Sequence, residues 1–305
     1  MARRDHLGGW ILSLGLTSES QSYDERAPAC RLVPASKFTV AALTDAYNRS
    51  RVDYIVPMPM NVARLQAYID TYDVDLTRSV VAMDGDDILG LAMLGTRPGH
   101  TWITRLGVLP VKRRSGAGEA MMSYLIEQSR DAGADHVMLE VIKDNEPAHR
   151  LFRKLGFVET RELLILRRPP GPPLTEVPAY SVVHGDREQA LALLARRRSQ
   201  PSWLDEVDSL RHSEDLQCLE AACDGAGRGW LVYEQTVFQL GRLIVQAEEG
   251  DPAEVARVLT HALHTAHAIQ DTKTENFPAS DPHLTGLQAM RYFESFRRIE
   301  MRLAL

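Results

Sequence analysis

The stretch R-R-S-G-A-G at residues 113–118 joins positive charge to two glycines between a strand-like run and a helix-like run. A strand that turns into a helix directs free backbone N–H groups and the positive end of the helix at one spot. Gly116 and Gly118 let a bulky anion approach, while Lys112, Arg113 and Arg114 add charge, and the planar guanidinium of arginine suits phosphate. The stretch therefore predicts a site for a diphosphate.

The two familiar nucleotide patterns do not fit this stretch. The sequence has no G-x-x-x-x-G-K-[ST], which excludes the usual phosphate loop. Its glycines follow a G-x-G spacing without a third glycine and without an early first strand, unlike a dinucleotide-binding fold. The diphosphate must therefore belong to another kind of ligand.

The stretch resembles the signature of the GNAT superfamily of acetyl-coenzyme A-dependent N-acetyltransferases. The family pattern [QR]-x-x-G-x-[GA] is met by Arg113, Gly116 and Gly118. The downstream pattern N-x-x-A-x-x-[LF]-[YF]-x-x-x-G-F is met, in the expected order along the chain, by Asn145, Ala148, Leu151, Phe152, Gly156 and Phe157. Both motifs together, on a compatible order of strands and helices, carry the resemblance over roughly residues 30–167.

The resemblance implies a fold and a set of cofactor contacts. It implies a mixed α/β sheet with helices on both faces, splayed so that the pantetheine arm of acetyl-coenzyme A lies between two strands. Pantetheine would pair with the backbone of Leu106, Gly107 and Val108, and a backbone N–H at Val108 would stabilise the oxyanion. Asn145, Ala148 and Phe152 would hold the coenzyme arm. The pyrophosphate would be surrounded by Lys112, Arg113, Arg114, Ser115, Gly116, Ala117, Gly118 and Glu119.

Acetyl transfer to an amine needs a base for the amine and a proton source for the departing thiolate. The family often supplies that proton from a tyrosine where this chain has Phe152, and a phenyl ring cannot donate one. Water, Tyr54 or Tyr124 remain as sources, and loss of activity remains an alternative. Glu140 is the first candidate for the base, because it precedes Val141 on the strand that would face the acceptor. The alternative bases are His136 and His100.

The chain length and a proline-rich segment predict two domains. At 305 residues the chain exceeds the usual size of a single core. The segment R-R-P-P-G-P-P-L at 167–174 can sustain neither a helix nor a central strand. We therefore expect an N-terminal extension at 1–29, a catalytic domain at 30–167, a linker at 168–174 and a second domain at 175–305.

Hydrophobic spacing predicts the elements that carry the motifs. One helix is expected from a cap at Ser36 to about Asn48, and another from about Val62 to Tyr72. Two strands flank D-G-D-D at 84–87, a hairpin signal, and a third leads into 113–118. The next helix would bury one face until a glycine ends it, and a strand follows. Asn145 then caps a helix, and strands close the half.

The second half repeats this order of elements without the loop chemistry. R-L-I-V at 242–245 aligns with R-L-G-V at 105–108, and F-E-S-F at 293–296 with K-L-G-F at 154–157. Where the glycine stretch would fall stands A-E-E-G-D-P, whose carboxylates would repel a pyrophosphate. We expect a degenerate copy that binds no coenzyme A, covers the sheet edge and shapes the acceptor pocket, with Trp203 docking between the domains.

Other features restrict the location and the partners of the protein. The net charge of −6 argues against a nucleic-acid binder and is compatible with a cationic acceptor. Three scattered cysteines suggest buried thiols in a reducing compartment, no run is long enough to span a membrane, and the start is a poor signal peptide. We therefore expect a cytoplasmic protein, with no metal and possible homo-oligomers. His261, His264 and His267 drift around a helix, which disfavours a zinc site.

The sequence thus predicts a tandem N-acetyltransferase that moves an acetyl group to a primary amine of a small molecule or peptide by direct attack. Met58 and Met60, near Tyr54, either line the acceptor pocket or plug an edge of the core. The rival function is an acyl-coenzyme A sensor that performs no chemistry, and a third possibility is a purely structural interaction protein.

Overall fold

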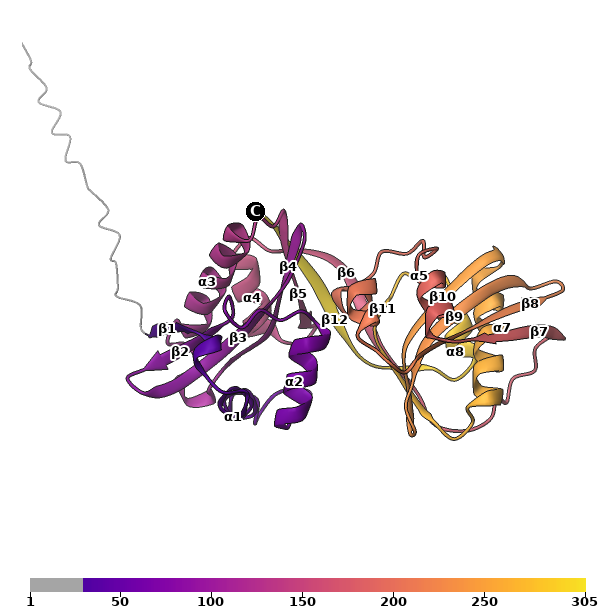
Figure 1. The fold of residues 1–305 in the computed structure, drawn as a ribbon, viewed down its shortest axis with the longest axis horizontal. Coiled ribbons are helices and arrows are strands. Elements are labelled where there is room, and N and C mark those ends of the chain that lie inside the picture. The colour runs from indigo at the N-terminus through magenta and orange to yellow at the C-terminus, as the bar shows by residue number, and fades with distance from the viewer. Residues whose placement is uncertain (1–29) are drawn as a thin grey trace, which may run out of the picture.

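The structure is a computed structural model that describes residues 30–305, and one continuous sheet runs through all of this part (Figure 1). The strands are β1 (Arg31–Pro34), β2 (Val80–Asp84), β3 (Asp87–Arg97), β4 (His100–Val108), β5 (His136–Ile142), β6 (Val158–Arg168), β7 (Tyr180–Gly185), β8 (Leu216–Cys223), β9 (Gly227–Gln235), β10 (Gln239–Gly250), β11 (Asp271–Pro278) and β12 (Phe293–Ala304). The predicted extension at 1–29 lies outside the described residues.

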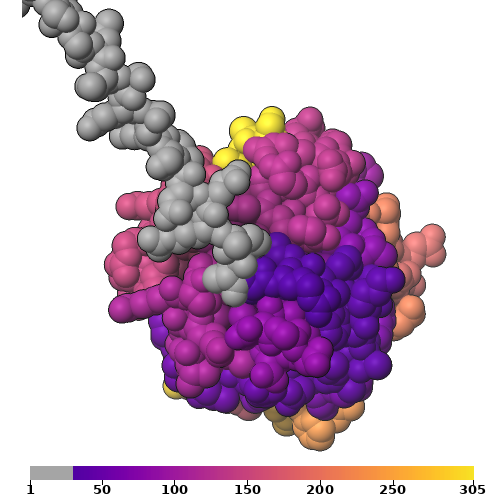
Figure 2. Space-filling model, turned by 90° about the vertical axis from the view of Figure 1, so that its left-hand side faces the viewer, coloured from indigo at the N-terminus to yellow at the C-terminus, as the bar shows by residue number. Residues whose placement is uncertain are grey.

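The two halves of the chain exchange their last strands. The strand order is β1-β2-β3-β4-β5-β12-β6-β11-β10-β9-β8-β7. Strand β12, the last in sequence, pairs antiparallel with β5 of the first half, while β6 pairs antiparallel with β11 of the second. Seen from the end of the first half, the yellow end of the chain therefore emerges among magenta residues of that half (Figure 2). The division into domains at the proline-rich segment stays a prediction.

Helices cover both faces of each half in the same arrangement. They are α1 (Val40–Ser50), α2 (Val62–Thr71), α3 (Ala117–Asp131), α4 (Glu146–Lys154), α5 (Arg187–Leu194), α6 (Val207–Arg211), α7 (Pro252–Ala266) and α8 (Leu284–Ala289). In the first half α1 and α2 pack on one face and α3 and α4 on the other. In the second half α5 and α6 oppose α7 and α8. The predicted mixed α/β sheet with flanking helices is confirmed.

Most of the predicted elements are confirmed, with one correction at the first helix. The hairpin turns at Gly85, which has a φ of 58°, and the side chain of Asn145 caps α4. Ser36, the predicted cap of the first helix, lies instead in a short 3-10 turn, where its N–H donates to the carbonyl of Leu76. Helix α1 begins only after Thr39, whose hydroxyl accepts from the N–H of Ala42.

The predicted repeat of element order is visible in the backbone. The aligned residues Arg105 on β4 and Arg242 on β10 both adopt left-handed conformations, with φ of 54° and 49°. Both lie next to irregularities in strand register, where a bulge turns the strand. Non-glycine residues rarely adopt this conformation, so its recurrence at aligned positions supports the alignment of the two halves.

Trp203, predicted to dock between the domains, is fully buried against the first half. It forms a short 3-10 turn with Leu204 and Asp205, stacks on Trp102 with ring centroids 5.6 Å apart, and donates from Nε1 to the carbonyl of Tyr72. The docking role of Trp203 is confirmed.

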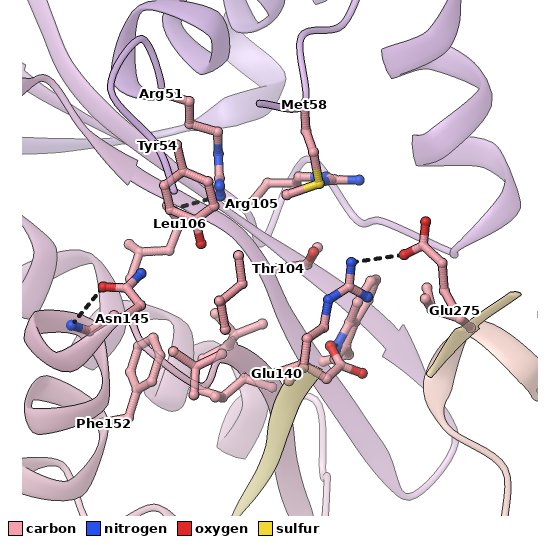
Figure 3. A pocket seen from close by; sticks show the side chains of 18 of the residues that line it. Arg51, Tyr54, Met58, Thr104, Arg105, Leu106, Glu140, Asn145, Phe152 and Glu275 are labelled. Carbon is pink, nitrogen blue, oxygen red and sulfur yellow. Dashed lines mark hydrogen bonds and ion pairs between the residues drawn. The ribbon is translucent and has the colours of Figure 1, made fainter. Parts of the chain in front are cut away.

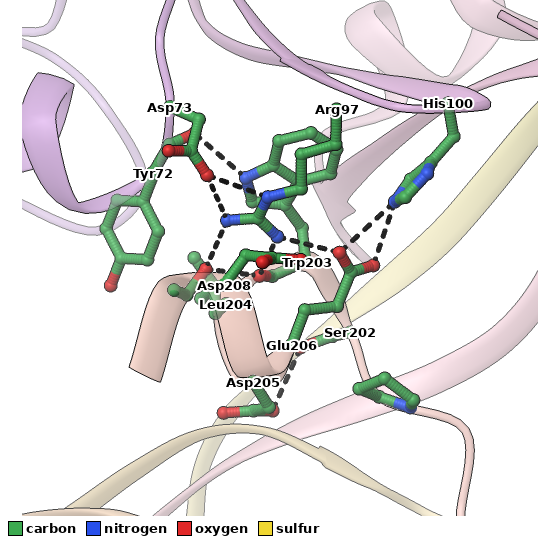
Figure 4. A network of polar contacts seen from close by, with 12 residues as sticks. Tyr72, Asp73, Arg97, His100, Ser202, Trp203, Leu204, Asp205, Glu206 and Asp208 are labelled. Atoms are coloured by element: carbon green, nitrogen blue, oxygen red, sulfur yellow. Dashed lines mark hydrogen bonds and ion pairs between the residues drawn. The ribbon is translucent and has the colours of Figure 1, made fainter. Parts of the chain in front are cut away.

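Arg97, at the end of β3, holds the same segment of the second half (Figure 4). Its buried guanidinium lies 4.0 Å from the ring centroid of Trp203 and forms ion pairs of 2.7 Å with both Asp73 and Glu206. It also donates to the hydroxyl of Ser209 at 2.7 Å. Such a cation, paired on both sides and fully used as a donor, fixes the two halves against each other.

Replacing Arg97 by alanine is expected to lower the free energy of unfolding by about 3–5 kcal/mol, because two partly buried carboxylates lose their cation. Urea denaturation measures this change. The matched control is Arg211→Ala on α6, whose exposed side chain pairs, within residues 30–305, only with Asp208, and its loss is expected to cost at most about 1 kcal/mol. Equal losses in the two variants would show that Arg97 does not hold the halves together.

Candidate active site

A cavity of the first half opens where two parallel strands part. Strands β4 and β5 pair only from His100 with His136 to Trp102 with Met138, and beyond this point they separate. The resulting cavity of about 320 Å³ is shown in Figure 3. It is lined by Arg51, Tyr54, Met58, Tyr68, Tyr72, Trp102, Ile103, Thr104, Arg105, Leu106, Leu139, Glu140, Val141, Ile142, Asn145, Ala148, Phe152, Leu204, Glu275 and Arg298.

The cavity brings together part of the predicted site. Leu106, Glu140, Asn145, Ala148 and Phe152 all line it, from β4, β5 and α4. Gly107, Val108 and the predicted pyrophosphate residues at 112–119 are not among its lining residues, because they follow the cavity along β4 into the start of α3. The predicted contacts thus fall into a cavity and a separate loop at the same end of the sheet.

The N-terminus of α3 is open to an anion. Its N-cap is Gly116, with a φ of 86° and no side chain to cap the helix, and among the described residues only a long contact of 3.5 Å joins the N–H of Ala117 to the hydroxyl of Ser115. The first N–H groups of a helix have no acceptor within the helix, so those of α3 are available to a ligand. A Cβ at Gly118 would meet only ordinary contacts, the nearest at 3.7 Å, so packing within the described chain does not require glycine there. Absence of a side chain leaves that space to a ligand.

The charged residues of this loop are mostly engaged by carboxylates. The guanidinium of Arg113 forms two hydrogen bonds with Asp53, of 2.8 and 2.6 Å, and Lys112 lies 3.2 Å from Asp84. The side chain of Glu119 accepts from Lys154. A pyrophosphate at this loop would compete with Asp53 for Arg113.

The backbone of β4 is shaped by close approach to α1. A Cβ on Gly107 would lie 2.3 Å from the hydroxyl oxygen of Ser50, so only glycine fits there. The carbonyl of Leu106, predicted to face pantetheine, accepts from Arg51 at 3.1 Å. Val108 ends the strand opposite Gly90 of β3. Residues 106–108 thus end the separated part of β4, and of these three only Leu106 lines the cavity.

Glu140 lies on the separated part of β5, with its carboxylate held between the two halves. One oxygen accepts from Nε1 of Trp102 at 2.7 Å, and the other accepts from Nδ2 of Asn276 at 3.1 Å. Burial raises the pKa of this carboxyl from 4.5 to about 7, against the opposing effects of Arg298 and the Trp102 hydrogen bond. A carboxylate that titrates near neutrality beside a cavity is suited to general base chemistry.

Glu275 on β11 is the counterpart of Glu140 in the second half. Each lies four residues beyond the first parallel pair of its half, which is His136 in β5 and Asp271 in β11. Burial alone would raise the pKa of Glu275, but Arg298 and Lys273, at 2.8 and 2.7 Å, bring it down to about 2. The two carboxylates that share the cavity therefore differ in charge state near neutral pH.

The two candidate tyrosines for proton donation lie in different places. Tyr54 lines the cavity beside Leu106, with its hydroxyl directed inward and the guanidinium of Arg51 4.3 Å from its ring centroid (Figure 3). Tyr124, on α3, packs against the same core as Phe152 and is not among the residues that line the cavity. Phe152 is buried against Phe157, with ring centroids 6.2 Å apart.

The alternative bases His100 and His136 lie away from the cavity. They stack on each other, with ring centroids 5.5 Å apart, at the start of β4 and β5, where the strands are still paired. His100 contacts Glu206 at 3.0 Å, and this hydrogen bond raises the pKa of the histidine. The contact therefore stabilises the fold below about pH 6.5 and is lost as the pH rises through the raised pKa.

The two methionines have separate surroundings. Met58 lines the cavity, while Met60 packs against the core beneath α1 and α2. Asn48 fixes the backbone of Met60 through hydrogen bonds to both its N–H and its carbonyl. Met58 thus lies beside the cavity and Met60 at the edge of the core, and both also line a neighbouring groove, so an acceptor role for either stays a prediction.

Several site residues were not predicted from the sequence. Arg51, Thr104 and Arg105 come from the first half, and Glu275, Asn276 and Arg298 come from the second. The K-T-E-N-F run was recognisable as a strand, but nothing in it signals contact with β5. Only the exchange of β6 and β12 brings the second half against the cavity.

The equivalent positions of the second half are closed. Strands β10 and β11 also pair only at their starts, yet the cavity beyond them measures only about 10 Å³. Strand β10 runs to Gly250, and only Asp251 separates it from α7. The carboxylate of Asp251 caps α7 by accepting from the N–H groups of Ala253 and Glu254.

The remaining predicted features are accounted for individually. Cys30, Cys218 and Cys223 are buried and free, as predicted. Residues 30–305 contain no cluster of three or more histidine, cysteine or carboxylate side chains arranged for a metal. His261 and His264 on α7, and His267 directly after it, hydrogen-bond to three different tyrosines. None of the described helices is both long and apolar enough to cross a bilayer.

Comparisons with known proteins agree with this geometry. Residues 42–157 match the model of the acetyltransferase (GNAT) family. A stretch of 84 residues is 32% identical to streptothricin acetyltransferase of Streptomyces lavendulae, and it covers 27% of this chain and 44% of the relative, so less than half of that relative is matched.

Solved structures resemble nearly all of the chain. A GCN5-related N-acetyltransferase from Sphaerobacter thermophilus has a TM-score of 0.65 at 16% identity, over 90% of this chain and 96% of that one. A tandem GNAT protein from the clavulanic acid biosynthesis pathway has a TM-score of 0.60 at 14% identity, over 90% and 98%. At these identities the likeness shows a common fold.

Proposed function

We propose that the first half, whose residues 42–157 match the acetyltransferase (GNAT) family, transfers an acetyl group from acetyl-coenzyme A to a primary amine. The acceptor is a small molecule or a peptide, and transfer is by direct attack in a ternary complex. The observation that carries this proposal is the uncapped start of α3 beside a cavity that holds Glu140. The start of α3 suits a diphosphate, and the cavity with Glu140 suits an amine.

Each step of the proposed transfer is assigned to a residue of the site. Glu140 takes a proton from the acceptor's ammonium group, and the neutral nitrogen attacks the thioester carbonyl. The C–N bond forms, the C–S bond breaks, and the thiolate takes a proton from the hydroxyl of Tyr54. The resulting tyrosinate takes, through water, the second proton that the nitrogen loses as it becomes an amide. The backbone N–H of Val108 meets the oxyanion, and the uncapped N–H groups of α3 hold the pyrophosphate. The products are the amide and free coenzyme A.

The second half, in this proposal, binds no coenzyme A. The Asp251 carboxylate already occupies the N–H groups of α7 that would receive a pyrophosphate, and like charge would repel it. The small size of the equivalent cavity supports the same conclusion. The second half instead supplies Glu275, Asn276 and Arg298 to the acceptor side of the first.

Thiol release from acetyl-coenzyme A, measured across a panel of amines, tests the proposal. Release that depends on one class of amine, with one acetyl-coenzyme A bound per chain, is the expected result. Binding of coenzyme A without release for any amine would favour the sensor, which Phe152 also favours. If the chain neither binds coenzyme A nor releases thiol, the proposed acetyl transfer is wrong.

Replacing Tyr54 by phenylalanine is expected to lower kcat by about tenfold, because water replaces the phenol only in part as the acid. The matched control is Tyr124→Phe, which is expected to leave kcat unchanged because that side chain is not among the residues that line the cavity. Steady-state kinetics of thiol release measure both. An unchanged kcat for Tyr54→Phe would assign the proton to water.

A further inference from the structure

A groove of about 490 Å³ continues from the active-site cavity toward α2 and the second half. The two spaces share Met58, Tyr68, Tyr72, Arg105 and Glu275, so an acceptor with its amine in the cavity would extend over these residues into the groove.

Cationic side chains outnumber carboxylates along the groove. Arg64, Arg105, Arg242 and Lys273 line it, against one carboxylate, Glu275. Glu275 is already paired with Lys273 and with Arg298, and Arg242 has Glu234 at 3.4 Å. Within residues 30–305, Arg64 and Arg105 form no ion pair with a carboxylate. The lining therefore carries positive charge that the described chain does not neutralise.

Arg105 and Arg242, which lie at the two strand bulges, each contact one of two adjoining tyrosines. Arg105 lies 4.0 Å from the ring centroid of Tyr68, and Arg242 donates to the hydroxyl of Tyr72 at 2.9 Å. The rings of Tyr68 and Tyr72 are in edge contact, with centroids 4.7 Å apart. These rings hold both guanidinium groups in place.

Arg105 has donors to spare where cavity and groove meet. Its one hydrogen bond within residues 30–305 is a long one, 3.3 Å, to the hydroxyl of Tyr47. Its Nε is buried with no partner there. A guanidinium presents donors in a planar fork that matches carboxylate and phosphate, so an anionic group of a ligand would satisfy it.

We propose that the acceptor carries an anionic group, a carboxylate or a phosphate, in addition to its amine, and that Arg105, Arg242 and Arg64 bind this group in the groove. This inference rests on the proposed acetyl transfer. It replaces the cationic acceptor suggested by net charge, because the lining of the groove and not the average surface meets the ligand. Glu140 and Glu275 receive the amine end, and the arginines receive the anionic end.

The test uses pairs of amines that differ only in the anion: β-alanine with β-alaninamide, and phosphoethanolamine with ethanolamine. The anionic member of at least one pair is expected to have a kcat/KM about tenfold higher, and the pair that shows it separates carboxylate from phosphate. Arg64→Glu is expected to raise KM for that member about tenfold and to leave its kcat, and the KM of the neutral twin, unchanged. The control Arg49→Glu reverses an exposed charge on α1 outside the groove and should alter neither.

The outcomes separate the inference from the proposed function. Thiol release with equal or better use of the neutral members, or no effect of Arg64→Glu, would overturn the anionic subsite and leave acetyl transfer standing. If no amine releases thiol, saturation-transfer NMR of the same pairs with coenzyme A present decides the inference. Preferential binding of the anionic members, weakened by Arg64→Glu, would support the subsite, and equal binding would overturn it.

Discussion

Replacing Glu140 by glutamine is expected to lower kcat by a factor on the order of 10²–10³ and to remove the rise of activity near pH 7. The wild-type carboxyl has its pKa raised by burial to about 7, so the fraction able to accept a proton grows as the pH passes this value. Glutamine keeps an oxygen for the N–H of Trp102 but cannot take a proton. Thiol release followed from pH 5.5 to 9 measures both effects.

Glu140→Gln, which lowers activity, is expected to make the stability of the fold less sensitive to rising pH. Because folding raises the pKa of Glu140, the folded chain binds this proton more tightly, so the carboxyl costs stability as the pH rises from about 4.5 to above 7. Glu140→Gln removes that cost, and the variant is expected to lose less stability than the wild type between pH 5 and pH 8. Urea denaturation at the two pH values measures the difference.

Glu300 offers a matched control, since it lies opposite Glu140 on β12 but is outside the cavity lining. Its buried carboxylate pairs with Arg161 at 2.8 Å. Glu300→Gln is expected to lower stability while its folded fraction keeps a rise of activity, moved to lower pH because the charge of Glu300 helps to raise the pKa of Glu140. If the rise persists in Glu140→Gln, another group is the base.

Replacing Gly116 by aspartate is expected to weaken binding of acetyl-coenzyme A by about a hundredfold. Two effects act together: the residue has a φ of 86°, which strains any side chain, and the new carboxylate stands at the uncapped N–H groups of α3. Isothermal titration with coenzyme A measures the loss. The change reproduces in the first half the arrangement that Asp251 has in the second.

Gly133→Asp is the control for strain, because Gly133 also has a positive φ, 71°, and open space around its Cβ, but follows the other end of α3. Both variants should lose comparable stability, and only Gly116→Asp should lose coenzyme affinity. Parallel losses of affinity would mean that strain in α3, rather than the anion site, governs binding.

The helices, strands and motifs could be predicted from the sequence, but the exchange of strands between the two halves could not. The cap at Asn145, the turn at Gly85 and the repeated element order are set by local residue chemistry, so they are readable from the chain. Thr39 caps the first helix in place of the predicted Ser36, because the backbone N–H of Ser36 donates to the carbonyl of Leu76, a residue distant in the sequence. The exchange of β6 and β12 depends on pairing between distant strands, which no local pattern encodes.

For the same reason, the surroundings of the candidate site residues could not be predicted. Glu140 was recognisable as a strand carboxylate, but its raised pKa comes from burial between the halves. Arg105 is part of an aligned tetrapeptide, yet neither its left-handed backbone nor its position over Tyr68 follows from the sequence. Residue types near the motif can be predicted, whereas their surroundings depend on the fold.

The place of β12 beside β5 also sets the order in which a ribosome can complete the active site. Every other described element is synthesised before β12, so until then the β5 edge that carries Glu140 lacks its neighbour. An unpaired strand edge is a template for aggregation. The β5 edge therefore stays open until the last strand is made, and early termination before Phe293 would leave a first half with an unpaired edge.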